Sequence, residues 1–412
     1  MKPSSHTRAV SRDSTQSPLG IHIPGFGKML SEQGYTRSTA QQKIHLVTDL
    51  DQWLRRRRVE VTALDEQHTI AFLDHRQTGD QSRRGDPATL RDLLRYLRGA
   101  GIIAAPALQA QPSTLDRIAA TFAEYLMAER GLMQATVRHY LSEVRQFLSH
   151  RFEAGDPLLS DLSANDVTQF IRWRARVVTP RRAQAAASSL RSFLRFLYQR
   201  GKIGMDLANV VPTVAYWRFS GLPRFLTPDE TERLLQVCDP RTVPGRRDYA
   251  ILLLLARLGL RAAEVVHMTL EDINWESGEL VIRGKSRRED LLPLPGDVGK
   301  ALARYLRRGR PHCSSRRVFI RLKAPHQGFS SSVAICDVVR RALSRAGLNP
   351  VIKGAHLLRH SLATRMLRAG ASMAEIGQIL RHRMANTTEI YAKVDLMALR
   401  ALAQPWPEVK HE

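Results

Sequence analysis

The chain has 412 residues, of which 43% are hydrophobic, and it carries a formal net charge of +24 with a sequence pI near 10.8. A single hydrophobic core rarely grows beyond about 250 to 300 residues, so this length predicts two or three domains. The hydrophobic fraction excludes a largely disordered protein, and the positive charge indicates a polyanionic partner such as nucleic acid. The alternative, an arginine-rich composition inherited from a GC-rich genome, does not by itself create so large an imbalance.

The three cysteines, Cys238, Cys313 and Cys336, are odd in number and widely separated, so neither a disulfide framework nor a zinc cluster is predicted. Such cysteine usage is typical of a reducing compartment. The polar N-terminus, residues 1–17, is expected to be disordered and lacks the apolar segment of a signal peptide. Because the longest apolar run, 251–256, is too short to cross a bilayer, we expect a cytoplasmic protein without a membrane segment.

The first half of the chain contains an internal repeat. Residues 34–39 align with 131–136, and residues 90–97 align with 190–197, each of these last two being followed by a glycine four positions on. Between them, Phe72 aligns with Phe170. Ordered matches at a nearly constant spacing predict a duplicated helical module.

The two modules are expected at about 18–104 and 112–205. In the second copy, apolar residues recur every three or four positions, which is typical of amphipathic helices. They include Leu115, Ile118, Phe122, Tyr125 and Leu126. Thr136 and Ser163 stand where helix N-caps are expected. The stretch after the first copy, 104–112, reads as a linker, and the prolines and glycine between 211 and 228 mark a second boundary.

The last part of the chain, 225–403, is predicted to combine helices with a small sheet. Thr227 and Glu230 have the spacing of a capping box, as do Ser372 and Glu375. Two short alternating segments, 279–283 and 290–294, predict a β-hairpin. Asn386 with Glu389 resembles a further cap, which would place Tyr391 early in a short helix.

For Arg261 and Lys285, a plain structural interpretation stands beside the functional one. Arg261 follows a glycine turn and is expected to project into a groove, or else to be a simple surface residue or to pair with Glu264 on its own helix. Lys285 lies at the end of a predicted strand, where most lysines simply face solvent. His356 and Arg359 share one helix face, which is expected to point away from the apolar stripe of that helix.

Two further candidates follow in the chain. His382 ends a helix, where a histidine often only interacts with the helix dipole. Tyr391 in isolation reads as an ordinary half-buried tyrosine. His360, next to Arg359, is interpreted as structural.

Taken together, five separated elements carry a resemblance to a known family. At Gly259-Leu260-Arg261, Gly284-Lys285, His356-x-x-Arg359, Leu380-x-His382 and Tyr391, the chain resembles the tyrosine recombinase (phage integrase) family. The resemblance implies a mainly α fold with a small β-sheet, in which helical SAM-like core-binding domains precede an α+β catalytic domain at 225–403.

The resemblance also assigns the modules. Residues 112–205 resemble the core-binding domain, which clamps one face of a DNA duplex. The module at 18–104 is an addition that extends the DNA footprint, joins protomers, or serves only as a scaffold. Residues 404–412 form a C-terminal tail. The preceding Leu396, Leu399 and Leu402 are expected to pack on a neighbouring protomer or on their own domain.

The chemistry implied by the family is phosphoryl transfer to tyrosine. Tyr391 attacks a DNA phosphate to give a 3′-phosphotyrosyl enzyme and a free 5′ hydroxyl, and strand exchange passes through a Holliday junction. Arg261 and Arg359 hold the nonbridging oxygens, to which His382 adds a hydrogen bond. His356 is the candidate general base and Lys285 the general acid.

No metal, ATP or other cofactor is expected to take part. The implied partners are double-stranded DNA and further protomers, in a homotetramer, or a hetero-oligomer with a related recombinase, on two DNA sites. Integration, excision or transposition of a mobile element and resolution of DNA multimers are all open.

One residue departs from the family pattern, and two rival functions remain. The family commonly has Leu-Gly-His before the tyrosine, whereas Arg381 replaces the glycine here, where its charge could touch phosphate. The rivals are a type IB topoisomerase, which shares the chemistry without strand exchange, and a catalytically silent DNA-binding accessory protein.

Overall fold

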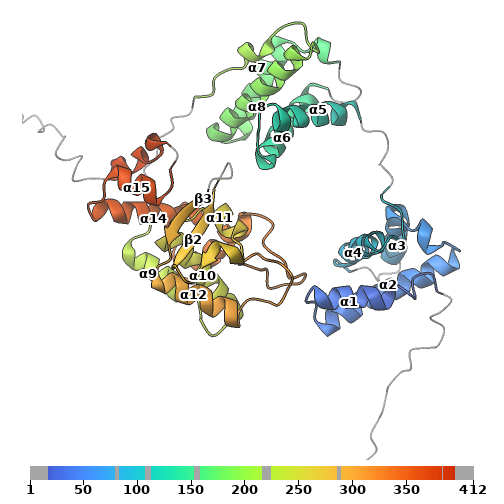
Figure 1. Ribbon diagram of the computed structural model, residues 1–412. Coiled ribbons are helices and arrows are strands. Elements are labelled where there is room, and N and C mark those ends of the chain that lie inside the picture. Colours follow the sequence, from blue (N-terminus) through green and yellow to red (C-terminus); the bar gives the residue numbers. More distant parts are fainter. Residues whose placement is uncertain are drawn as a thin grey trace, which may run out of the picture. The chain divides into compact units, whose positions relative to one another are not determined.

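The computed structural model describes residues 17–78, 83–106, 113–152, 158–215, 224–284, 289–382 and 384–394. These residues form helices and one three-stranded sheet (Figure 1), which confirms the predicted fold class. The chain divides into two compact units, Pro106–Ser220 and the segments on either side of it. None of the described helices combines the length and apolar character needed to span a membrane.

The N-terminal segment contains four α-helices around a hydrophobic cluster of its own. They are α1 (Ile23–Glu32), α2 (Arg37–Arg56), α3 (Glu66–Thr78) and α4 (Asp86–Gly99), with a 3-10 turn, η2 (Val61–Ala63), between α2 and α3. Phe26, Leu50 and Phe72 are fully or almost fully buried in this cluster. The Thr36 hydroxyl caps α2 by accepting from the backbone N–H of Thr39.

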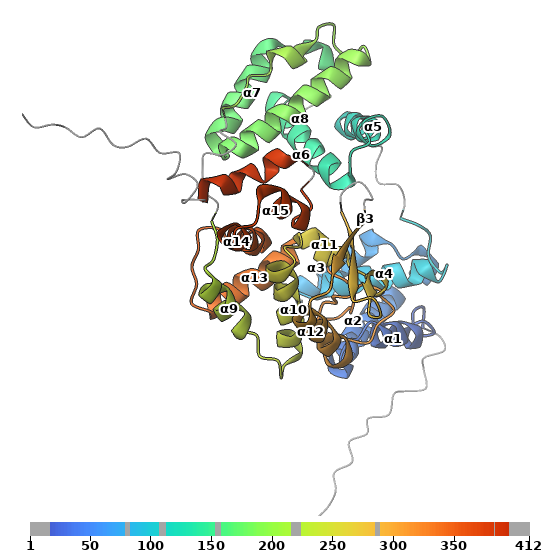
Figure 2. The ribbon, with the colours of Figure 1, turned by 60° about the vertical axis from the view of Figure 1, so that its left-hand side comes forward.

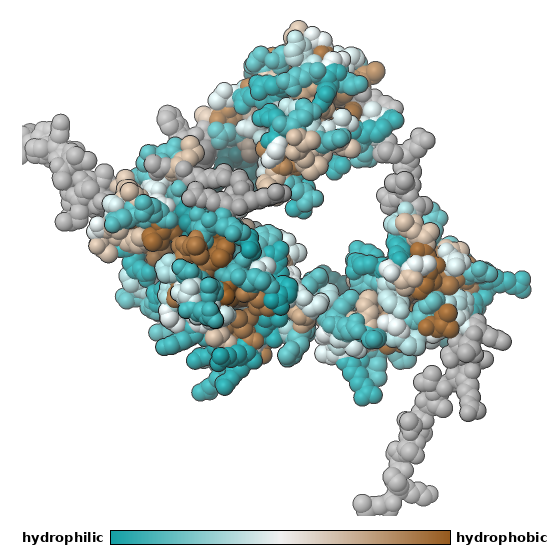
Figure 3. Space-filling model, in the orientation of Figure 1, coloured by the Kyte–Doolittle hydropathy of each residue, from teal (hydrophilic) through white to brown (hydrophobic). Residues whose placement is uncertain are grey.

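A second set of four α-helices fills the unit Pro106–Ser220. They are α5 (Thr114–Ala128), α6 (Gln134–Arg151), α7 (Ala164–Val177) and α8 (Pro180–Gln199), with 3-10 turns η3 (Leu159–Asp161) and η4 (Leu207–Val210). Phe122, Phe147, Phe170 and Phe193 build the core. On the face drawn in Figure 3, the surface of this unit is mostly hydrophilic.

The cap predictions for this unit had different outcomes. Ser163 forms the expected capping box with Asp166 at the start of α7. The prediction for Thr136 was wrong, because α6 begins at Gln134 after Met133. Thr136 therefore lies inside the first turn of α6 and does not precede the helix.

Features shared by α1–α4 and α5–α8 agree with the repeat. Gly34 and Gly131, which are paired in the alignment, both have a left-handed φ, at +85° and +61°. Gly101 and Gly201, which follow the last helix of each set, have φ values of +70° and +63°. Residues with a Cβ rarely adopt a left-handed φ. The paired glycines of the repeat therefore meet the same backbone requirement in both copies.

The C-terminal segment begins with five helices around a large aliphatic core. These are α9 (Pro228–Gln236), α10 (Val243–Arg257), α11 (Ala262–His267), α12 (Gly296–Arg308) and α13 (Val333–Arg345), with the 3-10 turn η5 (Leu270–Asp272). Helix α10 is central, since residues 250–256 are all buried. The predicted capping box of Thr227 and Glu230 starts α9.

The sheet is small and antiparallel, with strand order β1 (Ile273–Asn274), β2 (Glu279–Arg283) and β3 (Glu289–Pro293). Leu280 pairs with Leu292 across the predicted hairpin. The tip of this hairpin, including Lys285, lies outside the described residues.

Two further α-helices and two 3-10 turns complete the segment. Helices α14 (Ala355–Arg368) and α15 (Met373–Ile379) lie side by side (Figure 2). They are followed by η7 (Ala385–Thr387) and η8 (Glu389–Val394). A small cluster of buried residues belongs to this region, namely Leu362, Ala363, Ile376, Leu380 and Tyr391.

The caps of this last region were predicted only in part. Ser372 and Glu375 form the expected capping box of α15. The Asn386 prediction was wrong, because its side-chain oxygen is buried without a hydrogen-bond partner in the described structure. Tyr391 nevertheless lies early in a short helix, as expected, namely the 3-10 helix η8.

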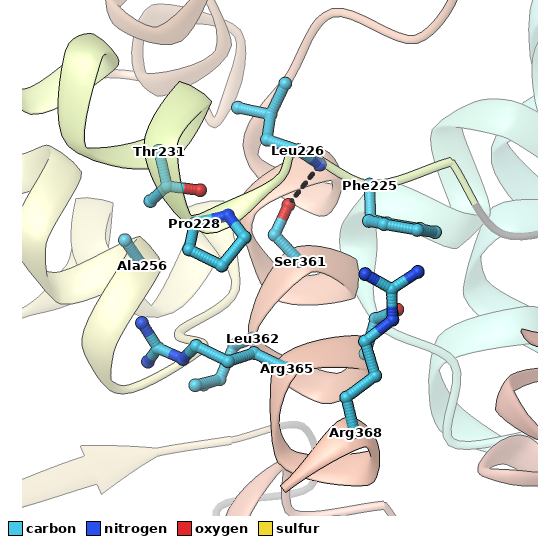
Figure 4. Close-up of a pocket in the computed structure, with 10 residues that line it drawn as sticks. Phe225, Leu226, Pro228, Thr231, Ala256, Ser361, Leu362, Arg365 and Arg368 are labelled. Carbon is cyan, nitrogen blue, oxygen red and sulfur yellow. Dashed lines mark hydrogen bonds between the residues drawn. The ribbon is translucent and has the colours of Figure 1, made fainter. Parts of the chain in front are cut away.

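A small hollow separates α9 from α14 (Figure 4). The backbone N–H of Leu226 donates to Ser361 Oγ at 2.8 Å and ties the segment before α9 to α14. The Arg368 guanidinium lies 4.8 Å from the centre of the Phe225 ring. Of the residues that α14 contributes to this hollow, Ser361, Arg365 and Arg368 lie on a different face from His356 and Arg359.

Candidate active site

Five of the six predicted site residues are described, and four of them meet at one place. Arg261 precedes α11, Arg359 lies in α14, His382 follows α15, and Tyr391 lies in η8. Backbone and side-chain contacts among these elements, given below, bring the four together. His356, one turn before His360 on α14, is exposed. Lys285, the sixth, cannot be placed because it lies outside the described residues.

Arg359 is buried, with 4% of its surface exposed. Its guanidinium donates from Nη1 to the Gly259 carbonyl and from Nη2 to the Leu380 carbonyl. Arg359 was expected to point away from the apolar stripe of its helix, and the structure shows that it is nevertheless buried. The end of α15 and the turn after α10 cover this face of α14. Each contributes a backbone carbonyl oxygen, so the surroundings of the buried guanidinium are polar.

Gly259 explains the first element of the motif. Its φ is +57°, and a Cβ built at this position would lie 2.7 Å from Leu380 Cδ2 and 3.0 Å from Leu362 Cδ2. A side chain is thus excluded both by backbone conformation and by space. This close approach lets the Gly259 carbonyl reach Arg359.

Arg261 pairs with Glu264, as the alternative interpretation allowed. Its Nη1 lies 2.6 Å from Glu264 Oε1, and its backbone N–H donates to Oε2 at 2.8 Å. Glu264 is buried, with 4% of its side chain exposed, whereas 36% of the Arg261 side chain is exposed. A buried carboxylate therefore binds the Arg261 guanidinium, and more than a third of the side chain stays exposed to an anion.

Tyr391 is almost completely buried, with 1% of its surface exposed. A hydrogen bond of 2.9 Å joins its hydroxyl to His360 Nδ1. Burial raises the pKa of Tyr391 to about 12, although the charge of Arg359 acts in the opposite direction. Burial, with His356 and Arg359 nearby, lowers the pKa of His360 to about 4. Near neutral pH the pair is thus a neutral phenol and a neutral imidazole.

His382 also lies beside the phenol ring of Tyr391. The two rings are within 5° of parallel, with centroids 6.4 Å apart. His382 Nδ1 lies 2.8 Å from the hydroxyl of the buried Thr388. Burial and the neighbouring arginines, Arg359 first, lower the pKa of His382 to about 4. If the Thr388 hydroxyl donates to Nδ1, the neutral ring carries its proton on Nε2, which is then a donor.

The sequence interpretation missed three residues of this cluster. His360 was interpreted as structural, but it bonds the phenol. Its position four residues after His356 was the available signal, because residues so spaced share a helix face. Thr388 offered no such signal, and Glu264 was considered only as a reason to discount Arg261.

The charges of the cluster do not balance. Arg261, Arg359 and Arg381 gather around one carboxylate, Glu264. Burial and the two other arginines lower the pKa of Arg359 to about 10, so it stays charged near neutral pH. A partly buried excess of guanidinium charge favours binding of an anion, and guanidinium matches phosphate oxygens in geometry.

The comparisons with known proteins agree with this geometry. Residues 224–397 match the model of the phage integrase family, and residues 119–201 match that of the phage integrase N-terminal SAM-like domain. The latter match begins inside α5 and ends two residues after α8.

Curated relatives cover most of the chain. It is 42% identical over 393 residues to a protein of Sinorhizobium fredii named "Putative integrase/recombinase y4rA", with 95% of each chain covered. It is 30% identical over 286 residues to the tyrosine recombinase XerD of Listeria monocytogenes, covering 68% of this chain and 94% of that protein.

Solved structures share the fold at lower identity. The XerH site-specific recombinase bound to its palindromic difH substrate matches with a TM-score of 0.52 and 17% identity, over 72% of this chain and 97% of that one. A lambda integrase dimer bound to a core site matches with a TM-score of 0.50 and 18% identity, over 72% and 99%.

These relatives favour neither a topoisomerase nor a silent accessory protein, because those named here are integrases or recombinases. From the two matching models, and from a relative that is 42% identical over nearly the whole length, we conclude that the chain belongs to the phage integrase family of tyrosine recombinases.

Proposed function

We propose that this protein is a site-specific DNA recombinase that cuts and rejoins strands through Tyr391. The observation that carries the proposal is the excess of guanidinium charge beside a tyrosine whose hydroxyl bonds a neutral histidine. Such a site binds a phosphodiester and keeps a nucleophile within reach of it. Neither group alone would distinguish this function from simple DNA binding.

The arginines are proposed to stabilise the transition state. Attack on a phosphodiester concentrates negative charge on the nonbridging oxygens, and donors fixed in advance stabilise that charge most effectively. Arg261 has an accessible guanidinium, and Arg359 is fixed by two carbonyls. A guanidinium has five N–H donors, so these bonds leave capacity for a phosphate. His382 would add a hydrogen bond from Nε2.

The proton transfers are assigned to the remaining residues. The Tyr391 Oη–P bond forms as the bond between phosphorus and the 5′ oxygen breaks. The phenol proton passes to a base, proposed as His356, and the departing oxygen takes a proton from Lys285. A base is needed because the pKa of Tyr391 is about 12. The 3′-phosphotyrosyl bond retains the energy of the phosphoester, so strand exchange through a Holliday junction needs neither ATP nor a metal.

The helical segments are proposed to hold the DNA. The division into modules at 18–104 and 112–205, a catalytic domain at 225–403 and a tail at 404–412 remains our proposal. The match of 119–201 to the SAM-like domain supports the second module as the core-binding clamp. The left-handed glycines that the segment α1–α4 shares with α5–α8 support common ancestry of the first module with the second. Its run of four arginines, 55–58, favours contact with DNA.

The assembly and biological role are also proposed. We infer a homotetramer, or a hetero-oligomer with a related recombinase, on two DNA sites. The resemblance to integrases favours movement of a mobile element by integration, excision or transposition. DNA as the substrate, together with the absence of paired cysteines, makes the cytoplasm the proposed location.

The test is covalent trapping. A nicked duplex from the DNA flanking the gene is incubated with the wild type and with Tyr391→Phe, without metal, and resolved on a denaturing gel. A protein–DNA adduct formed only by the wild type is expected. An adduct formed by Tyr391→Phe would show that another residue is the nucleophile. Salt-sensitive binding with no adduct from either protein would contradict an autonomous strand transferase.

A further inference from the structure

Arg381 has a backbone conformation that an arginine rarely adopts. Its φ is +54°, and among the described residues Arg58 is the other non-glycine residue with a positive φ. Glycine takes this conformation without strain, and glycine is common here in the family that the chain resembles. The interactions of the Arg381 side chain must therefore offset the strain.

The side chain of Arg381 turns inward, to Glu264. It is 6% exposed, and its Nη2 lies 2.9 Å from Glu264 Oε2. Its Nη1 donates to the Ile379 carbonyl at 3.1 Å. So little exposure argues against the expectation that its charge touches phosphate directly.

Arg381 and Arg261 are linked twice. Both guanidiniums bind the carboxylate of Glu264, and Arg261 Nη2 also donates to the backbone carbonyl of Arg381 at 3.1 Å. The three residues thus form a closed ring of hydrogen bonds. The preceding carbonyl, Leu380, accepts from Arg359, so the left-handed turn after α15 holds both arginines of the proposed site.

We propose that Arg381 is a positioning residue for DNA cleavage, which fixes the Arg261 guanidinium toward the scissile phosphate by sharing Glu264 with it. This inference rests on the proposed roles of Arg261 and Tyr391. A glycine would keep the backbone carbonyl but would leave Glu264 to neutralise Arg261 alone. With Arg381 present, one carboxylate serves two guanidiniums, and Arg261 retains more of its charge for the phosphate.

The electrostatics of Glu264 support this arrangement. Burial by itself would raise the pKa of the carboxyl, but Arg381 and Arg261 together hold it below its ordinary value. Glu264 is therefore ionised near neutral pH and able to bind both arginines.

The experiment compares Arg381→Gly with Arg316→Gly, a matched control. Both changes remove an arginine that binds a glutamate, but Arg316 binds Glu271 and not Glu264. At saturating nicked duplex, the single-turnover rate of adduct formation by Arg381→Gly is expected to fall roughly 10- to 100-fold, the size of a small misplacement of a catalytic group. Its Kd for DNA should change less than about twofold, since one buried charge contributes little to phosphate contacts. Arg316→Gly should cleave at the wild-type rate.

A second substrate separates positioning from general damage to the fold. A methylphosphonate at the scissile position lacks one negatively charged oxygen, so the reaction depends less on Arg261. The rate defects of Arg381→Gly and Arg261→Ala are expected to shrink together on this substrate. Arg381→Lys, which keeps the charge but not the planar fork, should recover part of the rate and remains informative if the glycine variant does not fold.

Three results would overturn the role of Arg381. They are wild-type cleavage by Arg381→Gly, a loss confined to DNA affinity, and an equal defect on both substrates. Failure of the wild type to form an adduct is a different result. It would contradict an autonomous strand transferase and, with it, the role given to Arg381.

Discussion

The two halves of the proposed site are held in different ways. Arg359 and Arg261 are fixed by backbone carbonyls and by a buried carboxylate. Tyr391 lies in a 3-10 turn that packs on a small satellite cluster, and its hydroxyl is held by one side chain, His360. The arginines of the proposed anion-binding half are thus already held in place, whereas the proposed reaction requires the tyrosine to exchange its histidine partner for a phosphate. Preorganised charge and a held nucleophile can therefore be perturbed separately.

The largest effect is expected when the anion-binding half loses the planar guanidinium of Arg359. Arg359→Lys keeps a positive charge but cannot bridge the Gly259 and Leu380 carbonyls while presenting a planar donor pair to phosphate. We expect adduct formation to fall roughly 10²- to 10³-fold, as for loss of one transition-state donor. Arg368→Lys, on the same helix but beside the hollow in Figure 4, is the control and should stay near wild type. Equal effects would mean that α14 tolerates no lysine on either face.

The next effect tests whether close packing sets the position of Arg359. Gly259→Ala introduces a left-handed alanine and a contact of 2.7 Å with Leu380. Gly278→Ala has the same backbone problem, at φ +65°, but nothing lies within 4 Å of its Cβ. Both changes should cost about 1–2 kcal/mol from conformation, and Gly259→Ala should cost about 1–3 kcal/mol more from overpacking. Chemical denaturation measures both, and similar losses would contradict the packing argument.

The tyrosine half is tested by a double-mutant cycle. His360→Phe leaves the buried phenol unsatisfied, and Tyr391→Phe leaves the imidazole unsatisfied, so each should lower the free energy of unfolding by about 1–3 kcal/mol. The double variant removes both polar groups, and its loss should fall short of the sum by about 0.5–3 kcal/mol, the usual coupling for residues in contact. Additive losses measured by urea denaturation would show that the hydrogen bond contributes nothing.

A fourth effect is a pH dependence of stability. Burial holds the pKa of His360 and of His382 at about 4 in the fold, whereas unfolded histidine titrates near its ordinary value of about 6.5. Between these values the unfolded chain binds more protons, so stability is complete above about pH 6.5 and decreases as the pH falls toward 4. Unfolding free energies at several pH values should show this slope, and it should be shallower in His360→Phe. An unchanged slope would mean that His360 is not held neutral.

The features predicted best from the sequence are those that depend on the spacing of nearby residues. The capping boxes at Thr227 and Ser372 follow from local hydrogen bonding, and the structure has both. The hairpin was predicted within one residue, because strand alternation is also local.

The burial of Arg359 could not be predicted, because it depends on carbonyls contributed by residues 100 positions before it and 21 after it. Helix periodicity identifies which residues share a face but not what packs against that face. For the same reason His360 was interpreted as structural, since its partner Tyr391 lies 31 residues away.

Burial of the proposed nucleophile also protects DNA that is not a target. A basic protein spends most of its time on nonspecific DNA, where phosphates are everywhere and sequence plays no part in binding. With 1% of Tyr391 exposed and its hydroxyl bonded to His360, those phosphates do not meet the phenol. Accidental nicking of the chromosome is thereby limited, and the free energy needed to expose the tyrosine becomes a threshold that only a correctly bound site has to overcome.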